Sequence, residues 1–338
     1  MRSGEFDIIA RYFAPLAMDG AFGLRDDAAI LDVAGQDRLV ITQDSILEGI
    51  HFLASDPLAS VAFKALAVNI SDCTAKGATP FVYSISLGLP DRFEDKDIAA
   101  LAEGLRAAQA LFGAQLSGGD TYRSPERLAI GVTLIGKLVE GKYVSRLGAR
   151  PGDIIAVTNT IGNAALGLLA ATGEFETQLD AETKALLLEA YRQPRPPFEL
   201  AAVIAKFANA SMDVSDGLLG DCEKLLAASG ATGTITREQV PVHPLVTPLL
   251  EHNNKHWDAI LSGGDDYQLL FTVTEKDWSA CCKAVEEASL AAGLREPHRV
   301  TAIGKVHGDT KPGEEGQSLF LTIEGVPQLV TKKSFSHF

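Results

Sequence analysis

The chain has 338 residues, of which 46% are hydrophobic and 22% are charged, as is usual for globular proteins with buried cores. Its 30 basic and 44 acidic residues give a formal net charge of −14, which argues against nucleic acid or an anionic membrane as a partner. A phosphate ligand is not excluded, because the divalent cations that accompany phosphates are held by acids. The length favours two domains.

The cysteines indicate a reducing compartment. The chain has four of them, with no CxxC pair, which is too few for a disulfide framework in a chain of this size. The N-terminal MRSGEFDIIA lacks the apolar stretch of a signal peptide, and the apolar run AALGLLAA (164–171) is too short to span a bilayer. We therefore expect a cytoplasmic protein that does not insert into membranes.

The first half is predicted to alternate strands and helices. In chain order we expect a strand at 38–44, a helix at 56–78, a strand at 81–89, a helix at 95–113 and a long strand at 126–139. Asp56 is the expected N-cap of the first helix, with Pro57 at its first position, and Gly113 closes the second helix.

A stretch punctuated by glycine and proline, RLGARPGD (146–153), is predicted to separate two domains, residues 1–148 and residues 149–338. A second α/β round is expected after it. It comprises a strand at 153–159, helices at 163–173 and 182–192, a short strand and turn at 208–216, a helix at 217–230, and an acidic loop with a strand at 259–273. Residues 308–318 are expected to form a loop or hairpin.

Acidic residues recur at the ends of apolar segments. They occur in RDDAAI (25–30), TQD (42–44), NISD (69–72), SGGD (117–120), MDVSDGLLGD (212–221) and SGGDD (262–266). Any single one of these could be a helix cap or an Asx-turn. As a set they are harder to explain that way, because Asp72 and Asn69 lie three apart on an apolar helix and no Lys or Arg lies within 212–221. Such thiolate-free, oxygen-rich clusters suit hard cations, chiefly Mg²⁺.

Glycines supply candidate phosphate-binding segments. Each SGGD places two small residues before an acid, so that backbone N–H groups can approach a phosphate, although a plain tight turn explains either copy equally well. By contrast, GVTLIGKL (131–138) only imitates a phosphate loop, since Leu138 stands where Ser or Thr is needed, and we predict a strand there. Arg146 could clamp a phosphate or be solvated, and His51 lacks partners at zinc spacing.

In their order and spacing, these motifs resemble those of thiamine-monophosphate kinases, a branch of the aminoimidazole ribonucleotide synthetase superfamily. The resemblance rests on GEFDIIARYF, RDDAAI, TQD, EGIHF, FKALAVNISDCTAKGATP, LSGGDTYR, SRLGARPGD, MDVSDGLLGD, SGGDDYQLLFTV and the terminal HF, from about residue 4 to the end. It implies transfer of the γ-phosphoryl group of ATP onto thiamine monophosphate, giving thiamine diphosphate and ADP. It also implies several Mg²⁺ ions and, as is often needed in the family, K⁺.

The resemblance implies roles for individual residues. The implied metal ligands are Asp27, Thr42, Asp44, Asp72, Asp120, Asp213 and Asp216. Gly119, Asp120, Arg146 and Ser215 would contact ATP, while His51, Asp265 and Phe335 would contact thiamine monophosphate. Among these, Asp44, Asp120, Arg146 and Asp213 are the candidate catalytic residues.

The implied fold is an N-terminal α+β domain joined to a C-terminal α/β domain with a mixed sheet. The four-stranded sheet of the first domain would form a β-barrel across a homodimer, and the ATP site would lie at the junction of domains in that dimer. The chain departs from the family pattern at Gln43, where Ser or Thr is usual, at Asp265, where Glu is usual, and at Phe335, where Tyr is frequent.

Other functions remain open at this stage. Selenophosphate synthetases carry a reactive residue near the N-terminus, whereas the first cysteine here is Cys73, and hydrogenase-maturation dehydratases end on Cys, whereas this chain ends on Phe338. An enzyme like aminoimidazole ribonucleotide synthetase is the nearest alternative. A Mg·ATP sensor without turnover and a structural cation-binding protein are the alternatives from other classes.

Overall fold

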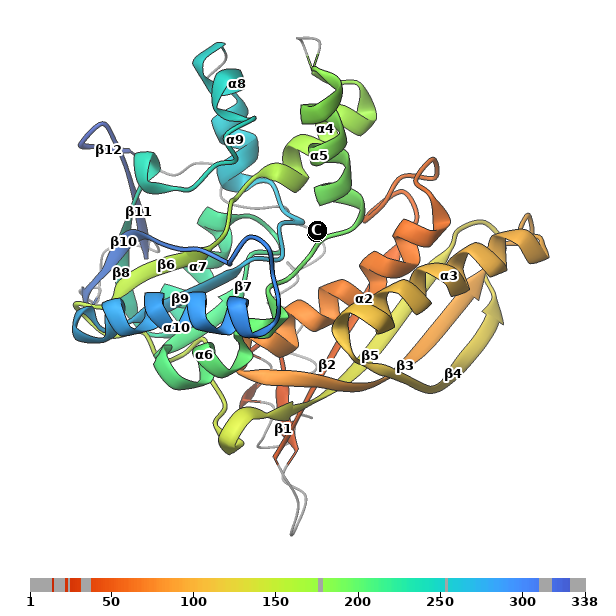
Figure 1. Ribbon diagram of the computed structural model, residues 1–338, viewed down its shortest axis with the longest axis horizontal. Coiled ribbons are helices and arrows are strands. Elements are labelled where there is room, and N and C mark those ends of the chain that lie inside the picture. Colours follow the sequence, from red (N-terminus) through yellow and green to blue (C-terminus); the bar gives the residue numbers. More distant parts are fainter. Residues whose placement is uncertain are drawn as a thin grey trace.

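The computed structural model describes Ala14, Phe22–Gly23 and residues 25–31, 38–175, 179–252, 255–309 and 318–328. Phe335, the terminal HF and most of the opening motif GEFDIIARYF therefore lie outside the described residues, as does most of the loop expected at 308–318. The described chain forms two sheets, each covered by helices, and they lie side by side in Figure 1.

The first half builds a sheet in the order β1-β2-β5-β3-β4. Its elements are β1 Ala29–Leu31, β2 Leu39–Leu47, α2 Leu58–Ala75, β3 Ala78–Leu89, α3 Asp95–Phe112, β4 Gln115–Arg123 and β5 Ala129–Leu138. Four long strands match the predicted sheet, and the short β1 is added at one edge. The strand expected over GVTLIGKL is confirmed within β5.

Alternation along β5 decides which face of this sheet is covered. Its even-numbered residues are buried, because Ile130, Val132, Leu134 and Leu138 pack in the core beneath the helices. Helices α2 and α3 lie over that face in Figure 1. The two helices approach so closely that a Cβ added to Gly104 would lie 2.0 Å from the carbonyl oxygen of Ala59.

Helix α2 is the central element of the molecule. By length and composition this helix could cross a membrane. However, 83% of its 18 residues are buried within the protein, which fits the core helix of a globular fold. The predicted N-cap is wrong. Pro57 occupies the cap position without a side-chain cap bond. Asp56 instead accepts hydrogen bonds from the backbone N–H of Leu53, the hydroxyl of Tyr191 and Nε of Arg192.

The second half forms a mixed sheet in the order β12-β11-β8-β10-β6-β9-β7. The strands are β6 Ile154–Thr158, β7 Ala210–Asp213, β8 Ala231–Thr236, β9 Leu269–Val273, β10 Val300–Asp309, β11 Leu319–Ile323 and β12 Val326–Gln328. The helices are α4 Asn163–Thr172, α5 Ala181–Arg192, α6 Ala201–Phe207, α7 Leu218–Ala228, α8 Thr247–His252, α9 Lys255–Ser262 and α10 Trp278–Ala291. Strand β11 runs parallel to β8 and the other pairs are antiparallel.

Both faces of this second sheet are buried. Along β6, Ile155 and Val157 pack into the cluster that contains α7 residues, whereas Ile154 and Ala156 pack into the cluster of α6 and α10. Every residue of β6, β7 and β9 is buried. Helix α2 packs against β7 and β9, so it contacts both sheets.

Candidate functional site

Polar side chains are buried along α2, a helix otherwise made of apolar residues. Lys64 is 2% exposed and Asn69 is fully buried, as is Lys76 immediately after the helix. A charged or amide group without partners would be costly in such a position. Each of these groups therefore points to an interaction that the fold has built, and together they organise the site.

The first group of acids lies between β2 and α2. Thr42 donates a hydrogen bond of 2.8 Å to Oδ2 of Asp72, and the backbone N–H of Asp44 donates to Oδ1 of Asn69 at 3.0 Å. Residues 42 and 44 share the helix-covered face of the sheet because side chains alternate along a strand. Gln43 points to the other face, where its Oε1 accepts from the hydroxyl of Thr133, so this departure from the family pattern lies outside the acidic group.

Asp213 joins these acids from the second half, at the end of β7. Burial, together with the negative charge of Asp27, raises its pKa to about 8. Burial also raises the pKa of Asp72, well above the usual range, with the charges of Asp44 and Asp213 adding to the effect. Asp44 keeps an exposed surface, but the protein packed around its carboxyl group raises its pKa, and the charges of Asp27 and Asp216 add to the effect. We call Asp44, Asp72 and Asp213 the acid cluster.

The acid cluster fits a hard divalent cation by its chemistry. Its members destabilise one another's ionised forms, so a positive charge among them would be favourable, and they offer oxygen ligands without sulfur. In the described part of the chain, no three His, Cys, Asp or Glu side chains converge closely enough to hold an ion between them. Mg²⁺ does not require that, because it uses one or two carboxylates and completes its shell with water and phosphate oxygens.

Two other predicted metal ligands are paired with bases in the structure. Asp27 has Nζ of Lys76 at 2.6 Å from Oδ2 and Nη1 of Arg146 at 3.0 Å from Oδ1. Burial would raise the pKa of Asp27, but the charges of Lys76 and Arg146 outweigh it and the pKa is lowered. This does not fit the predicted role of Asp27 as a magnesium ligand.

Asp216 is the second such acid, with Nζ of Lys224 at 2.5 Å from its Oδ2. Lys224 also pairs with Asp221, whose Oδ2 accepts the backbone N–H groups of Ser215, Asp216 and Gly217. The absence of bases within 212–221 was therefore misleading. Lys224 follows Asp221 by three residues on α7, so the helix places its ammonium group beside both Asp221 and Asp216.

The predicted substrate residues His51 and Asp265 are brought together by Lys64. Its Nζ lies 2.7 Å from Oδ2 of Asp265 and donates to the carbonyl oxygen of His51 at 3.1 Å. The other Asp265 oxygen accepts from the hydroxyl of Tyr267. Nδ1 of His51 accepts the backbone N–H of Leu47, which places the proton of the neutral ring on Nε2.

The segment SGGD at 117–120 is not a turn, so the tight-turn interpretation of this copy is wrong. It lies within β4, whose nine residues are all exposed at the edge of the sheet. The register runs from Ser45 through Gly131 and Ser86 to Asp120, so Asp120 lies three strands from β2 and on the face opposite Asp44. This chain therefore does not bring Gly119 and Asp120 to its own acid cluster.

The second SGGD segment does form a loop against the turn at Ser215. A Cβ on Gly264 would lie 2.1 Å from the carbonyl oxygen of Ser215, so only glycine fits there. Asp265 and Tyr267 both have left-handed backbone conformations, with φ of 72° and 49°. Such conformations are costly for residues with side chains, and the surrounding hydrogen bonds hold the loop in place.

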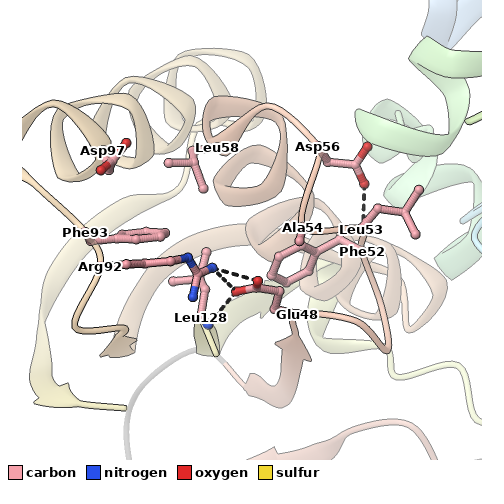
Figure 2. A pocket seen from close by; sticks show the side chains of 10 residues that line it. All are labelled: Glu48, Phe52, Leu53, Ala54, Asp56, Leu58, Arg92, Phe93, Asp97 and Leu128. Carbon is pink, nitrogen blue, oxygen red and sulfur yellow. Dashed lines mark hydrogen bonds and ion pairs between the residues drawn. The ribbon is translucent and has the colours of Figure 1, made fainter. Parts of the chain in front are cut away.

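A cavity of about 240 Å³ lies beside the segment that carries His51. Figure 2 shows Arg92 directed at Glu48 across it, with the rings of Phe52 and Phe93 nearby. Arg92 contacts both carboxylate oxygens of Glu48 at 2.6 Å. The other acids of its lining are also bonded, Asp56 to Arg192 and Asp97 to the backbone N–H of Glu94, so the cavity does not have the character of a cation site.

Sequence reasoning missed Lys64, Lys76 and Lys224. For the first two a signal was present, because a lysine on a largely apolar helix, or directly after it, must meet an acid or a carbonyl group when it is buried. Their partners could not be read from the sequence, since Asp265 lies 201 residues from Lys64.

Comparisons with known proteins agree with this architecture. The family model of the N-terminal domain of AIR synthase related proteins matches residues 25–138, and that of the C-terminal domain matches residues 150–315. The thiamine-monophosphate kinase of Caulobacter vibrioides is 37% identical over 297 residues, covering 86% of this chain and 82% of the relative. That of Escherichia coli K12 is 32% identical over 342 residues, covering 100% and 99%.

Solved structures extend the similarity to the whole fold. The structure of AaThiL complexed with AMPPCP and TMP superposes with a TM-score of 0.82 at 31% identity, covering 100% of this chain and 99% of the other. The structure of tt0281 from Thermus thermophilus gives 0.79 at 25% identity, covering 97% and 98%. The chain therefore belongs to the AIR synthase related family and, within it, to the thiamine-monophosphate kinases.

Proposed function

We propose that this protein uses ATP to phosphorylate thiamine monophosphate, giving thiamine diphosphate and ADP. The observation that carries the proposal is the acid cluster of Asp44, Asp72 and Asp213, set where α2 meets both sheets. The charges of Asp44 and Asp213 act on Tyr267, whose hydroxyl bonds to Asp265. Relatives named thiamine-monophosphate kinase match over their full length, and a similar structure holds AMPPCP and TMP.

The reaction asks the protein mainly for positioning and charge neutralisation. An oxygen of the thiamine monophosphate phosphate attacks the γ-phosphorus of ATP, the new P–O bond forms, and the bond to the β,γ-bridging oxygen breaks with its electron pair leaving on ADP. The attacking phosphate is already ionised near neutral pH, so no general base is required. His51 offers the proton on Nε2 as a hydrogen-bond donor to that phosphate.

Within this proposal, Asp44, Asp72 and Asp213 would hold Mg²⁺ ions, without all three binding the same ion, and Thr42 orients Asp72 through its hydroxyl. When bound, Mg²⁺ neutralises charge on the phosphate oxygens. Arg146 and Ser215 contact ATP. Asp216, next to Ser215 in the chain, forms an ion pair with Lys224. Asp265 holds the thiamine substrate, with Phe335 as a further contact from outside the described residues. K⁺ is proposed as an additional ion only on the basis of the family resemblance.

We also propose that two copies of the chain complete the site. In the described residues, α2 and α3 cover one face of the first sheet, while the opposite face carries Asp120, Ser86, Gly131 and Ser45 in one row. Strand β4 is an exposed edge with Leu116 at 48% and Tyr122 at 44% exposure. A barrel between copies would cover this surface and bring Gly119 and Asp120 to the partner's acid cluster.

We also propose that the chain divides into two domains, residues 1–148 and residues 149–338, and that the protein is cytoplasmic. The location is supported by the absence of disulfides, since all four cysteines lie in the described part of the chain and are free there.

The proposed reaction is tested by following both products. Purified protein is incubated with ATP, Mg²⁺, K⁺ and thiamine monophosphate, with and without a chelator. Equal amounts of thiamine diphosphate and ADP, abolished by the chelator, are expected. ADP without thiamine diphosphate would indicate another acceptor of the superfamily, and nucleotide binding without either product would indicate a sensor.

A further inference from the structure

Lys76 is a fully buried lysine at the junction of the two halves. Its Nζ lies 2.8 Å from Oδ1 of Asp26 and 2.6 Å from Oδ2 of Asp27, and it donates a hydrogen bond of 2.8 Å to the carbonyl oxygen of Ser211. The two acids precede β1, whereas Ser211 belongs to β7 of the second sheet. The ammonium group therefore joins oxygens from both halves of the chain.

The surrounding groups are arranged as a shell around one positive charge. Two carboxylates and one backbone carbonyl are the ligand types that hard cations take from proteins. The remaining oxygens of the two acids are also engaged, because Asp26 accepts from Ser145 at 2.6 Å and Asp27 from Arg146 at 3.0 Å. Lys76 directly follows the C-terminus of α2, where the helix dipole favours a positive charge.

A free ion could enter this shell only by displacing an ammonium group that is covalently part of the chain. The side chain of Lys76 is 0% exposed and that of Asp26 is also 0% exposed, so a lysine that left would have to move through packed protein. If the lysine were removed, Asp27 would keep one basic partner, Arg146, and Asp26 would lose its ion pair. Uncompensated buried charges of this kind are strongly destabilising.

We propose that the Lys76 ammonium is a built-in cation, filling a site between the two halves that would otherwise require a free metal ion. Asp27 is then a ligand of Lys76 and Arg146 rather than of Mg²⁺, and this position needs no K⁺. The inference refines the cation set of the proposed kinase, but its test does not use the kinase reaction and can fail independently of it.

The test is cation rescue of Lys76→Met. Thermal unfolding is followed without nucleotide in choline chloride, KCl and MgCl₂ at matched ionic strength. In choline chloride, the unfolding temperature of Lys76→Met should lie several degrees below that of the unchanged protein. In KCl or MgCl₂, the unfolding temperature of the variant should rise by at least about 3 °C more than that of the unchanged protein does. Lys142→Met, at an exposed lysine, is the matched control and should behave as the unchanged protein.

The outcomes separate cleanly. A Lys76→Met protein that is as stable as the unchanged one in choline chloride, or one that is destabilised without any rescue by either cation, overturns the proposal. If the methionine variant folds only when a cation is present, that is the expected rescue in its extreme form. If it folds in no salt, the same comparison is made with Lys76→Gln, which keeps a hydrogen-bond donor in place of the charge.

A second measurement addresses Asp27 with Lys76 intact. Bound Mn²⁺ is counted by electron paramagnetic resonance in the presence of AMPPCP, for the unchanged protein and for Asp27→Asn. The same number of bound Mn²⁺ ions is expected in both, because Asp27 does not hold one. Loss of one Mn²⁺ in Asp27→Asn would contradict the proposal.

Discussion

Nζ of Lys64 lies 2.7 Å from Oδ2 of Asp265, an ion pair that joins residues 201 positions apart. The ammonium group is nearly buried, and it also lies 4.6 Å from the centre of the Tyr191 ring. Through its bond to the carbonyl oxygen of His51, the same lysine fixes the spacing of two predicted substrate residues from different halves. The arrangement of these two predicted substrate residues therefore depends on a lysine that has no predicted contact with the substrate.

Replacing this lysine tests its positioning role. Lys64→Met should lower the free energy of unfolding by about 3 kcal/mol, because it leaves a largely buried carboxylate without its base. It should also raise KM for thiamine monophosphate by about tenfold while leaving KM for ATP nearly unchanged. Steady-state kinetics and denaturant unfolding measure the two effects, with Lys142→Met as control. Equal changes in both KM values would reduce Lys64 to a purely structural residue.

The position of Asp120 predicts complementation between copies of the chain. Asp120→Asn and Asp213→Asn should each be inactive alone, but after they are unfolded and refolded together about a quarter of the normal activity should return. This follows because half of the dimers would be mixed and each mixed dimer would hold one intact site. Activity is measured against the fraction of each variant, with the singly refolded variants as controls. No recovery despite dimer formation would place Asp120 outside the partner's site.

Asp266 predicts a pH dependence of stability. It accepts the backbone N–H groups of Gly162 and Ala164 at the start of α4, and burial raises its pKa to about 7. Because this exceeds the unfolded value of 3.8, its contribution to stability is present at low pH and is lost as the pH rises from about 4 to about 7.

Asp266→Asn, which resembles the protonated acid, should remove that loss. Relative to the variant, the unchanged protein should lose on the order of 2 kcal/mol of unfolding free energy between pH 4 and pH 7.5. Urea unfolding of both proteins across this range measures the difference. A difference that stays constant with pH would show that Asp266 does not titrate there.

The close approach of α2 and α3 predicts a steric effect at Gly104. Gly104→Ala should lower the free energy of unfolding by about 1–3 kcal/mol, since the added Cβ meets the Ala59 carbonyl oxygen and one helix must move. The gain in helix propensity is smaller than this cost. Gly308→Ala serves as control, because its Cβ would have nothing within 4 Å. Equal unfolding midpoints for both variants would contradict the helix contact.

The fold was largely predictable because hydrophobic periodicity determines strands and helices locally. The pattern over 126–139 predicts β5, and Gly113 ends α3 with the expected left-handed conformation. Local signals failed where tertiary contacts decided the outcome. Asp56 is used by Tyr191 and Arg192 instead of capping α2, and Gly118 and Gly119 extend an edge strand instead of forming a turn.

For the site, sequence identified the acids better than their neighbours. Asp44, Asp72 and Asp213 all belong to acidic segments that the sequence singles out, and the fold brings the three together. Which acids are compensated within the chain could not be predicted, because Lys76 and Asp27 meet only after both halves have folded. Asp120 was grouped with the other acids by motif alone, whereas strand register places it on the opposite face of the sheet.

The most direct test of the central claim follows the γ-phosphoryl group itself. ATP labelled with ³²P at the γ-position is given to the unchanged protein and to Asp213→Asn with Mg²⁺ and thiamine monophosphate. We predict that the label appears in thiamine diphosphate with the unchanged protein, and that the variant transfers it at least about a hundredfold more slowly. Label released only as inorganic phosphate, or equal transfer by both proteins, would contradict a kinase that works through this acid cluster.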